Sequence, residues 1–264
     1  MQGQEEAGSY SDFRMPAGGQ SLRVRVCELR EEPKKTMAAI ISADALMATY
    51  SFQHAGGEFE VQLRPGGIFY AASYPDPKAR WAVKEVAGAG TTVCINWGQF
   101  GYYELAVTDA STLEASGSAV DLATGVAAPA DWRKMKATRP FSVCERCLFG
   151  AAGTGSEWSF EWSGGAFPVE FRADAYNHFY CKQYPAHSHW RLGGASVDEL
   201  TIDWATFGQY EMKMAPDGKT GSGSAKGNPA DWRKMTFVGD LGVVEDIDHG
   251  HGHSHGGVPC SGNH

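Results

Sequence analysis

Two stretches of the chain repeat one another: Ile95-Asn-Trp-Gly-Gln-Phe-Gly-Tyr-Tyr-Glu-Leu105 and Ile202-Asp-Trp-Ala-Thr-Phe-Gly-Gln-Tyr-Glu-Met212. In each stretch apolar and aromatic residues alternate with polar ones, which is the period of a strand with one buried face. The Phe-Gly step between the two halves is typical of a turn, because glycine adopts backbone angles that other residues resist. Each stretch therefore predicts an aromatic-rich β-hairpin.

The duplication extends on both sides of the hairpin. Trp81 matches Trp190 at an offset of 190 − 81 = 109, and Trp132 matches Trp232 at 232 − 132 = 100. The offset changes because residues are inserted or deleted between the shared blocks, as happens in loops that join strands. Turn residues every 8–12 positions separate about eight strand candidates per copy. In the second copy these candidates lie near 158–163, 168–173, 178–184, 188–192, 199–205, 209–214, 220–226 and 231–237.

This pattern predicts an all-β protein of two tandem homologous domains, each an antiparallel meander closed as a barrel or packed as a sandwich. The expected segments follow in chain order. They are a leader with a strand and a short helix (1–48), a first repeat (49–141), a linker with Cys144-Glu-Arg-Cys147 (142–157), a second repeat (158–239) and a flexible His-rich tail (240–264).

The order of features also loosely resembles the calycin barrels, that is, lipocalins and their relatives. Those barrels open with a Trp-bearing strand and carry a basic residue on the last strand. Trp158 or Trp162 and Arg233 hold these places here, although the lipocalin Gly-x-Trp opening is missing from both copies. The resemblance implies a barrel and carries no activity with it.

Composition excludes several classes of function. The net charge of −8 disfavours a general nucleic-acid binder, which needs clustered Lys and Arg. The sequence has no run of 18 apolar residues, so a transmembrane helix is not expected. Residues 1–12 are polar and acidic, which is not the pattern of a secretory signal. Six cysteines in 264 residues favour reduced thiols, so we expect a cytoplasmic protein.

The repeated aromatic residues have two interpretations. Trp and Tyr at strand spacing are more often core residues than a ligand platform. If the barrels hold a ligand, the rings would line its site, and a small apolar molecule or a carbohydrate would fit. The candidate ligand-binding residues are Trp81, Trp97, Tyr103, Trp190, Trp204 and Tyr210.

The tail carries the sharpest chemical signal, because imidazole and thiolate groups suit Zn²⁺ and Ni²⁺. Its candidate ligands are His249, His251, His253, His255, Cys260 and His264. The stretch resembles the His-rich tails of nickel and zinc chaperones and the His-rich terminal segment of some PITH-domain proteins. Both resemblances cover the tail alone. We expect a divalent transition metal, zinc or nickel, to bind there.

Two further groups leave alternatives open. Cys144 and Cys147 are either free thiols or half of a zinc site completed from elsewhere, for example by Cys181. His187 and His189 lie on one side of a predicted strand, where the first copy has Lys78 and Arg80.

The sequence contains no Gly-x-Ser-x-Gly, P-loop, dinucleotide or His-Glu-x-x-His motif. The favoured hypothesis is therefore a non-enzymatic binding protein for a small ligand or a protein partner, with a metal-binding tail. One alternative is a metal- or carboxylate-dependent hydrolase in the second repeat, using Asp203 and Glu211 with the two histidines. The other is a structural subunit of a larger assembly.

Overall fold

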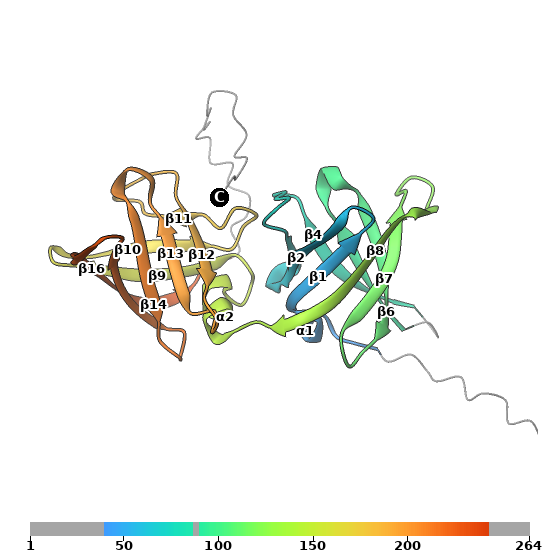
Figure 1. Cartoon of the computed structure of the whole chain (residues 1–264), viewed down its shortest axis with the longest axis horizontal. Helices are drawn as coiled ribbons and strands as arrows, with labels where there is room; N and C mark the ends of the chain where they lie inside the picture. Colours follow the sequence, from blue (N-terminus) through green and yellow to red (C-terminus); the bar gives the residue numbers. More distant parts are fainter. Residues whose placement is uncertain (1–39, 87–89, 243–264) are drawn as a thin grey trace, which may run out of the picture. The chain divides into compact units, whose positions relative to one another are not determined.

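The structure is a computed structural model that describes residues 40–86 and 90–242. In these ranges the chain forms two short α-helices, three 3-10 turns and sixteen strands. Figure 1 shows the strands as two groups that follow one another along the sequence, β1–β8 and β9–β16. The strand expected over 22–27 and the His-rich tail lie outside the described residues.

The first group is a closed barrel in which every strand pairs antiparallel with the next, and β1 pairs with β8. Sequential antiparallel pairing needs only short connections, so the order of strands in the sheet is the order in the chain. The strands are β1 (Ala48–His54), β2 (Gly57–Arg64), β3 (Ile68–Tyr70), β4 (Arg80–Val86), β5 (Gly90–Asn96), β6 (Tyr102–Asp109), β7 (Glu114–Val120) and β8 (Ala127–Pro140).

The second group repeats this order, with β9 paired to β16 as β1 is to β8. Its strands are β9 (Gly155–Trp162), β10 (Gly165–Arg172), β11 (Phe179–Tyr180), β12 (His189–Gly193), β13 (Glu199–Asp203), β14 (Gln209–Met214), β15 (Thr220–Ala225) and β16 (Asn228–Asp240). The prediction of an all-β protein with two tandem antiparallel meanders is confirmed.

Each group closes through a single residue pair. In the first barrel β3 meets β4 only at Ile68 and Arg80. In the second, β11 and β12 are the two ends of the sheet, and an isolated bridge between His178 and His189 joins them. We call these two bridges the seams of the barrels.

The duplicated stretch forms the predicted hairpin in both copies, with the same register. Ile95 faces Tyr103 across β5 and β6, and Ile202 faces Tyr210 across β13 and β14. The 3-10 turns η2 (Gly98–Phe100) and η3 (Ala205–Phe207) join the strands, and the third turn, η1 (Pro65–Gly67), follows β2. Both hairpin turns end at a glycine with positive φ, 108° at Gly101 and 95° at Gly208. The predicted turn glycines therefore adopt the angle that favours glycine.

Aromatic rings fill the interior of each barrel. In the first, the rings of Phe69 and Trp97 meet edge to face at 5.1 Å between centroids. In the second, Phe179 and Trp204 meet in the same way at 5.0 Å. Such pairs add about 0.5–1.5 kcal/mol each to the burial of their area.

A short helix precedes each barrel. Helix α1 (Ala43–Leu46) buries Leu46 in the first core, and α2 (Val143–Phe149) buries Cys144, Leu148 and Phe149 in the second. Ser142 caps α2 and receives the backbone N–H of Glu145, whose side chain in turn accepts the N–H of Ser142. This reciprocal capping box explains why the segment expected as a linker begins with a helix.

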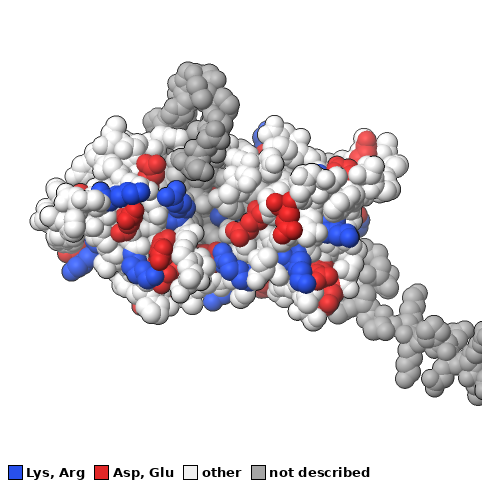
Figure 2. Space-filling model, in the orientation of Figure 1, with Lys and Arg blue, Asp and Glu red and all other residues white. Residues whose placement is uncertain are grey.

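Charged side chains of both signs are interspersed on the face of the molecule seen in Figure 2. Some charged side chains pair across strands, such as Lys136 of β8 with Glu114 of β7 at 2.7 Å. Within the described ranges, neither the length nor the hydropathy of any helix suffices to cross a bilayer.

Candidate metal centre

The six aromatic residues proposed for ligand binding lie in the two cores. Their exposed fractions are Trp81 5%, Trp97 4%, Tyr103 2%, Trp190 4%, Trp204 3% and Tyr210 3%. The indole N–H of Trp97 donates to the carbonyl of Tyr74 at 3.2 Å, and that of Trp204 donates to the carbonyl of Tyr184 at 3.3 Å. These residues pack in the core of their own barrels, and Trp97 and Trp204 also donate hydrogen bonds to loop carbonyls. Ligand binding by them stays a prediction.

The cysteines of the Cys-x-x-Cys segment lie on α2, packed against the loop after β14. The thiol of Cys144 donates to the carbonyl of Ala215 at 3.8 Å, and that of Cys147 to the carbonyl of Asp217 at 3.9 Å. Burial is the main cause that raises the pKa of both thiols. Both are free, as is the buried Cys181, and no metal-binding group in the described part of the chain includes any of the three. The described residues therefore supply no further ligand beside the two thiols, and both alternatives for them stay predictions.

Three histidines converge at the seam of the second barrel. Each of His178, His187 and His189 offers one ring nitrogen, and the three nitrogens all lie within 4.8 Å of one another. The ring centroids are 5.7 Å apart for His178 and His187, 5.0 Å for His178 and His189, and 4.6 Å for His187 and His189. His187 is exposed and the other two are half-buried. Within residues 40–86 and 90–242 this is the one group of three or more His, Cys, Asp or Glu side chains that is arranged to hold an ion.

The backbone brings two of these side chains together. The N–H of Phe179 donates to the carbonyl of Ser188 at 2.9 Å, and the N–H of Trp190 donates to the carbonyl of Asn177 at 2.8 Å. These bonds flank His178 and His189, which therefore form a non-hydrogen-bonded antiparallel pair. In such a pair the Cα atoms are only about 4.5 Å apart and the side chains approach closely. His187 joins the pair from the same side because it is two residues before His189 in an extended segment.

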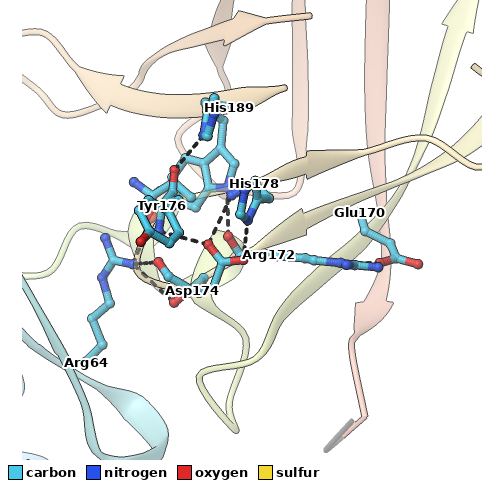
Figure 3. Close-up of polar contacts among 10 residues, drawn as sticks. Arg64, Glu170, Arg172, Asp174, Tyr176, His178 and His189 are labelled. Carbon is cyan, nitrogen blue, oxygen red and sulfur yellow. Dashed lines mark hydrogen bonds and ion pairs between the residues drawn. The ribbon is translucent and has the colours of Figure 1, made fainter. Parts of the chain in front are cut away.

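Hydrogen bonds orient two of the imidazoles, as Figure 3 shows. Nδ1 of His178 lies 2.7 Å from Oδ2 of Asp174, and Nδ1 of His189 lies 2.9 Å from the carbonyl oxygen of Tyr176. Since a carboxylate and a carbonyl only accept, each Nδ1 carries the proton in these bonds. The lone pair of each ring then resides on Nε2. Metal-binding histidines are held by carboxylate and carbonyl partners in the same way, which also raises the basicity of the ligating nitrogen.

Asp174 also organises the loop that carries His178. Its Oδ1 accepts the backbone N–H groups of Tyr176 at 3.0 Å and His178 at 3.2 Å. Burial works to raise the pKa of Asp174, but the hydrogen bond and charge of His178 and these two N–H groups outweigh it, so the pKa is lower than usual. The carboxylate is therefore an anion that holds His178 in place.

A buried arginine supports the same loop. From the end of β2, Nη1 of Arg64 donates to the carbonyl of Ala173 at 3.2 Å and to Oδ1 of Asn177 at 2.8 Å. Burial lowers the pKa of Arg64 to about 10. Asn177 has a positive φ of 54°, in the left-handed region that Asn enters more readily than most residues other than glycine. The bonds from Arg64 join this loop to β2, so the position of the loop does not rest on local sequence alone.

The seam of the first barrel has the same backbone and different side chains. Ile68 and Arg80 pair there as His178 and His189 do in the second. Lys78 takes the place of His187. The first seam therefore has two cationic side chains and one apolar side chain at the positions where the second seam has three imidazoles. Both histidines at which the second copy is predicted to differ from the first belong to this group, and metal binding by them stays a prediction. The comparison of the copies does not indicate His178, although the loop that carries it differs in length: four residues lie between Arg64 and Phe69, and six lie between Arg172 and Phe179.

The carboxylates proposed for catalysis are only partly near this site. Asp203 is opposite His189 across β12 and β13. Glu211 is opposite Thr201, two residues away from the place facing Asp203, and its carboxylate lies 3.6 Å from Nζ of Lys226. The register therefore does not pair the two acids directly, and only Asp203 adjoins the histidines.

Three imidazole nitrogens are a ligand set that suits Zn²⁺, Cu²⁺, Ni²⁺ and related ions. A tetrahedral Zn²⁺ site with Zn–N bonds of 2.0–2.1 Å has nitrogens roughly 3.3 Å apart. Small side-chain rotations would close the 4.8 Å group to that spacing.

No protein-family model, no curated protein and no solved structure matches this chain.

Proposed function

We propose that the protein binds a divalent transition-metal ion, with Zn²⁺ as the best fit, through His178, His187 and His189 of the second barrel. One observation carries the proposal. Nδ1 of His178 and Nδ1 of His189 are both bound to acceptors, at 2.7 and 2.9 Å, so that Nε2 of each ring is left to coordinate. One ring nitrogen from each of the three histidines belongs to a group within 4.8 Å, which is the spacing of a ligand set.

The His- and Cys-rich tail from His249 to His264 is, in this proposal, a second place on the chain for the same class of ion. The four described free cysteines fit a reducing compartment such as the cytoplasm. Binding of an ion at the barrel requires neither a nucleotide nor a second protein, which agrees with a binding role rather than a motor or transfer role.

The experiment is a Zn²⁺ titration by calorimetry on the full-length chain in which the tail ligands are replaced. This background variant carries Ala at His249, His251, His253, His255 and His264 and Ser at Cys260. It should bind one ion per chain. His178→Ala and His189→Ala should each weaken binding by at least 100-fold, since each removes one of three ligands, a larger loss than the roughly 10–100-fold typical of removing a ligand's hydrogen-bond partner.

His54→Ala is the matched control, because His54 is at the end of β1 in the first barrel and outside the three-histidine group. It should leave the affinity unchanged. Circular dichroism should show that all variants keep the β fold. Failure of the background variant to bind Zn²⁺, or equal affinity in the His178 and His54 variants, would exclude the proposed site.

A further inference from the structure

The three-histidine site offers an ion fewer protein ligands than it needs. A four-coordinate ion has one position beyond three imidazoles. In the described part of the chain no fourth His, Cys, Asp or Glu side chain belongs to the group. The nearest carboxylate of the loop, Asp174, is engaged at both oxygens, Oδ1 by the N–H groups of Tyr176 and His178 and Oδ2 by Nδ1 of His178.

Other charged groups around the loop are also paired. Glu170 binds Arg172 at 2.8 Å, as drawn in Figure 3, and the guanidinium of Arg172 lies 4.5 Å from the ring centroid of Tyr180. Because His187 is exposed and His178 and His189 are half-buried, water reaches the cluster from the side of His187. A solvent molecule is therefore the ligand that the geometry makes available for the fourth position.

We propose that the bound ion keeps this fourth position exchangeable and that the site hydrolyses small, uncharged esters. This inference rests on the proposed function. Three protein ligands with one open position are the arrangement of catalytic zinc sites, whereas structural sites have four protein ligands. Zn²⁺ lowers the pKa of its bound water to about 7, so that hydroxide is present at neutral pH.

The reaction balances without a further reactant. The zinc-bound water loses a proton to the buffer, and the hydroxide oxygen forms a bond to the carbonyl carbon of the ester. The bond from that carbon to the alkoxy or aryloxy oxygen breaks, and this oxygen leaves with the electron pair and takes the proton of the attacking hydroxide, so that an alcohol or phenol and a carboxylate form. The carboxylate product leaves the ion, and a new water takes its position.

Charge and shape set the substrate class. The carboxylates of Asp174 and Asp203 flank the histidines, Asp174 through His178 and Asp203 opposite His189. Together they offset the two positive charges of the ion, so the loaded site has no net charge that would favour a charged substrate. The site is on the outer side of a strand seam whose third ligand, His187, is exposed. Unhindered neutral esters therefore suit it better than long or charged ones.

The test measures metal binding and ester hydrolysis separately. In the full-length background variant without tail ligands, Co²⁺ replaces Zn²⁺ as a spectroscopic probe, and azide is added as a small competing ligand. Hydrolysis of 4-nitrophenyl acetate is measured with the Zn²⁺-loaded and the metal-free protein. A sample of free Zn²⁺ at the same concentration measures the background reaction.

We expect Co²⁺ to bind at one ion per chain with the intense visible absorption of four-coordinate Co²⁺, and azide to change that spectrum. We expect the Zn²⁺-loaded protein to hydrolyse the ester at least tenfold faster than the metal-free protein or free Zn²⁺. The His178→Ala variant should lose this increase, and His54→Ala should retain it.

Absence of stoichiometric Co²⁺ binding would overturn the proposed function itself. Stoichiometric binding with a spectrum that azide leaves unchanged, and with hydrolysis equal to that of the metal-free protein, would overturn only this inference. The site would then hold a structural ion whose coordination is already complete.

Discussion

The two barrels share one architecture and differ most in chemistry at their seams. In the first, Ile68 and Arg80 form the single closing pair, and in the second, His178 and His189 do so. The buried hairpins keep their register in both copies, with Ile95 opposite Tyr103 and Ile202 opposite Tyr210. The shared core residues are therefore the same in both barrels, whereas the seam is where the second copy has three histidines in place of an isoleucine, a lysine and an arginine.

The largest loss of unfolding free energy should come from substitutions of the core tryptophans that both barrels share. Trp97→Ala and Trp204→Ala each remove a ring that is at most 4% exposed and contacts several other rings, so each should cost about 3–5 kcal/mol of unfolding free energy. Urea denaturation followed by circular dichroism measures both. Trp162→Ala, at a ring that is 37% exposed, should cost clearly less. A loss below 1 kcal/mol for either core variant would show that the repeated tryptophan does not hold its barrel.

Zinc should stabilise the second barrel and leave the first unchanged. A ligand at 100 times its Kd stabilises the folded state by about 2.7 kcal/mol. Hydrogen exchange should slow at the seam amides of Phe179 and Trp190, which bond across the bridge at 2.9 and 2.8 Å. The equivalent amide of Phe69, bonded to Ala79 at 3.4 Å, is the internal control. Equal slowing at Phe69 would place the ion elsewhere.

Asp174 should determine how well His178 binds the ion. Asp174→Asn removes the charge that receives Nδ1 of His178, and loss of such a partner typically weakens metal binding by about 10–100-fold. Asp76→Asn is the control in the first barrel, because Asp76 also accepts backbone N–H groups, from Lys78 and Gln99. Its variant should bind Zn²⁺ as tightly as the parent protein. Equal weakening by both changes would indicate a general loss of stability.

Removing the N-caps of the helices that precede the barrels should change the free energy of unfolding least. Ser142→Ala breaks a capping box, and we expect a cost of about 1 kcal/mol. Ser42 caps the four-residue helix α1 by one bond of 3.3 Å to the N–H of Ala45, so Ser42→Ala should cost less. Thermal unfolding of the two variants measures the difference, and a larger loss for Ser42 would contradict it.

The repeated hairpins and the number of strands follow directly from the sequence. Alternation at Val93, Ile95 and Trp97 places these side chains inside, where they are at most 4% exposed. Such period-2 patterns lie within the sequence of a single strand, so they can be recognised without knowing which strand pairs with it.

The metal centre depends on information that is not local. His187 and His189 stand out as a pair, but His178 joins them only because Phe179 and Trp190 set the register of a bridge between two loops. The role of Asp174 requires the positive φ of Asn177, which no pattern in the sequence indicates. Helix α2 is a different case, because Ser142-Val-Cys-Glu145 is a capping pattern that the sequence does contain.

The single-pair seam bears on how a duplicated barrel acquires chemistry. A residue in a central strand has a ladder on each side, so an insertion there shifts the register of its neighbours. The loops before and after the bridge of His178 and His189 have no such ladder, and the second copy has two residues more between Arg172 and Phe179 than the first has between Arg64 and Phe69. A single-pair bridge can therefore accommodate a change of loop length that a central strand cannot accommodate without a shift of register.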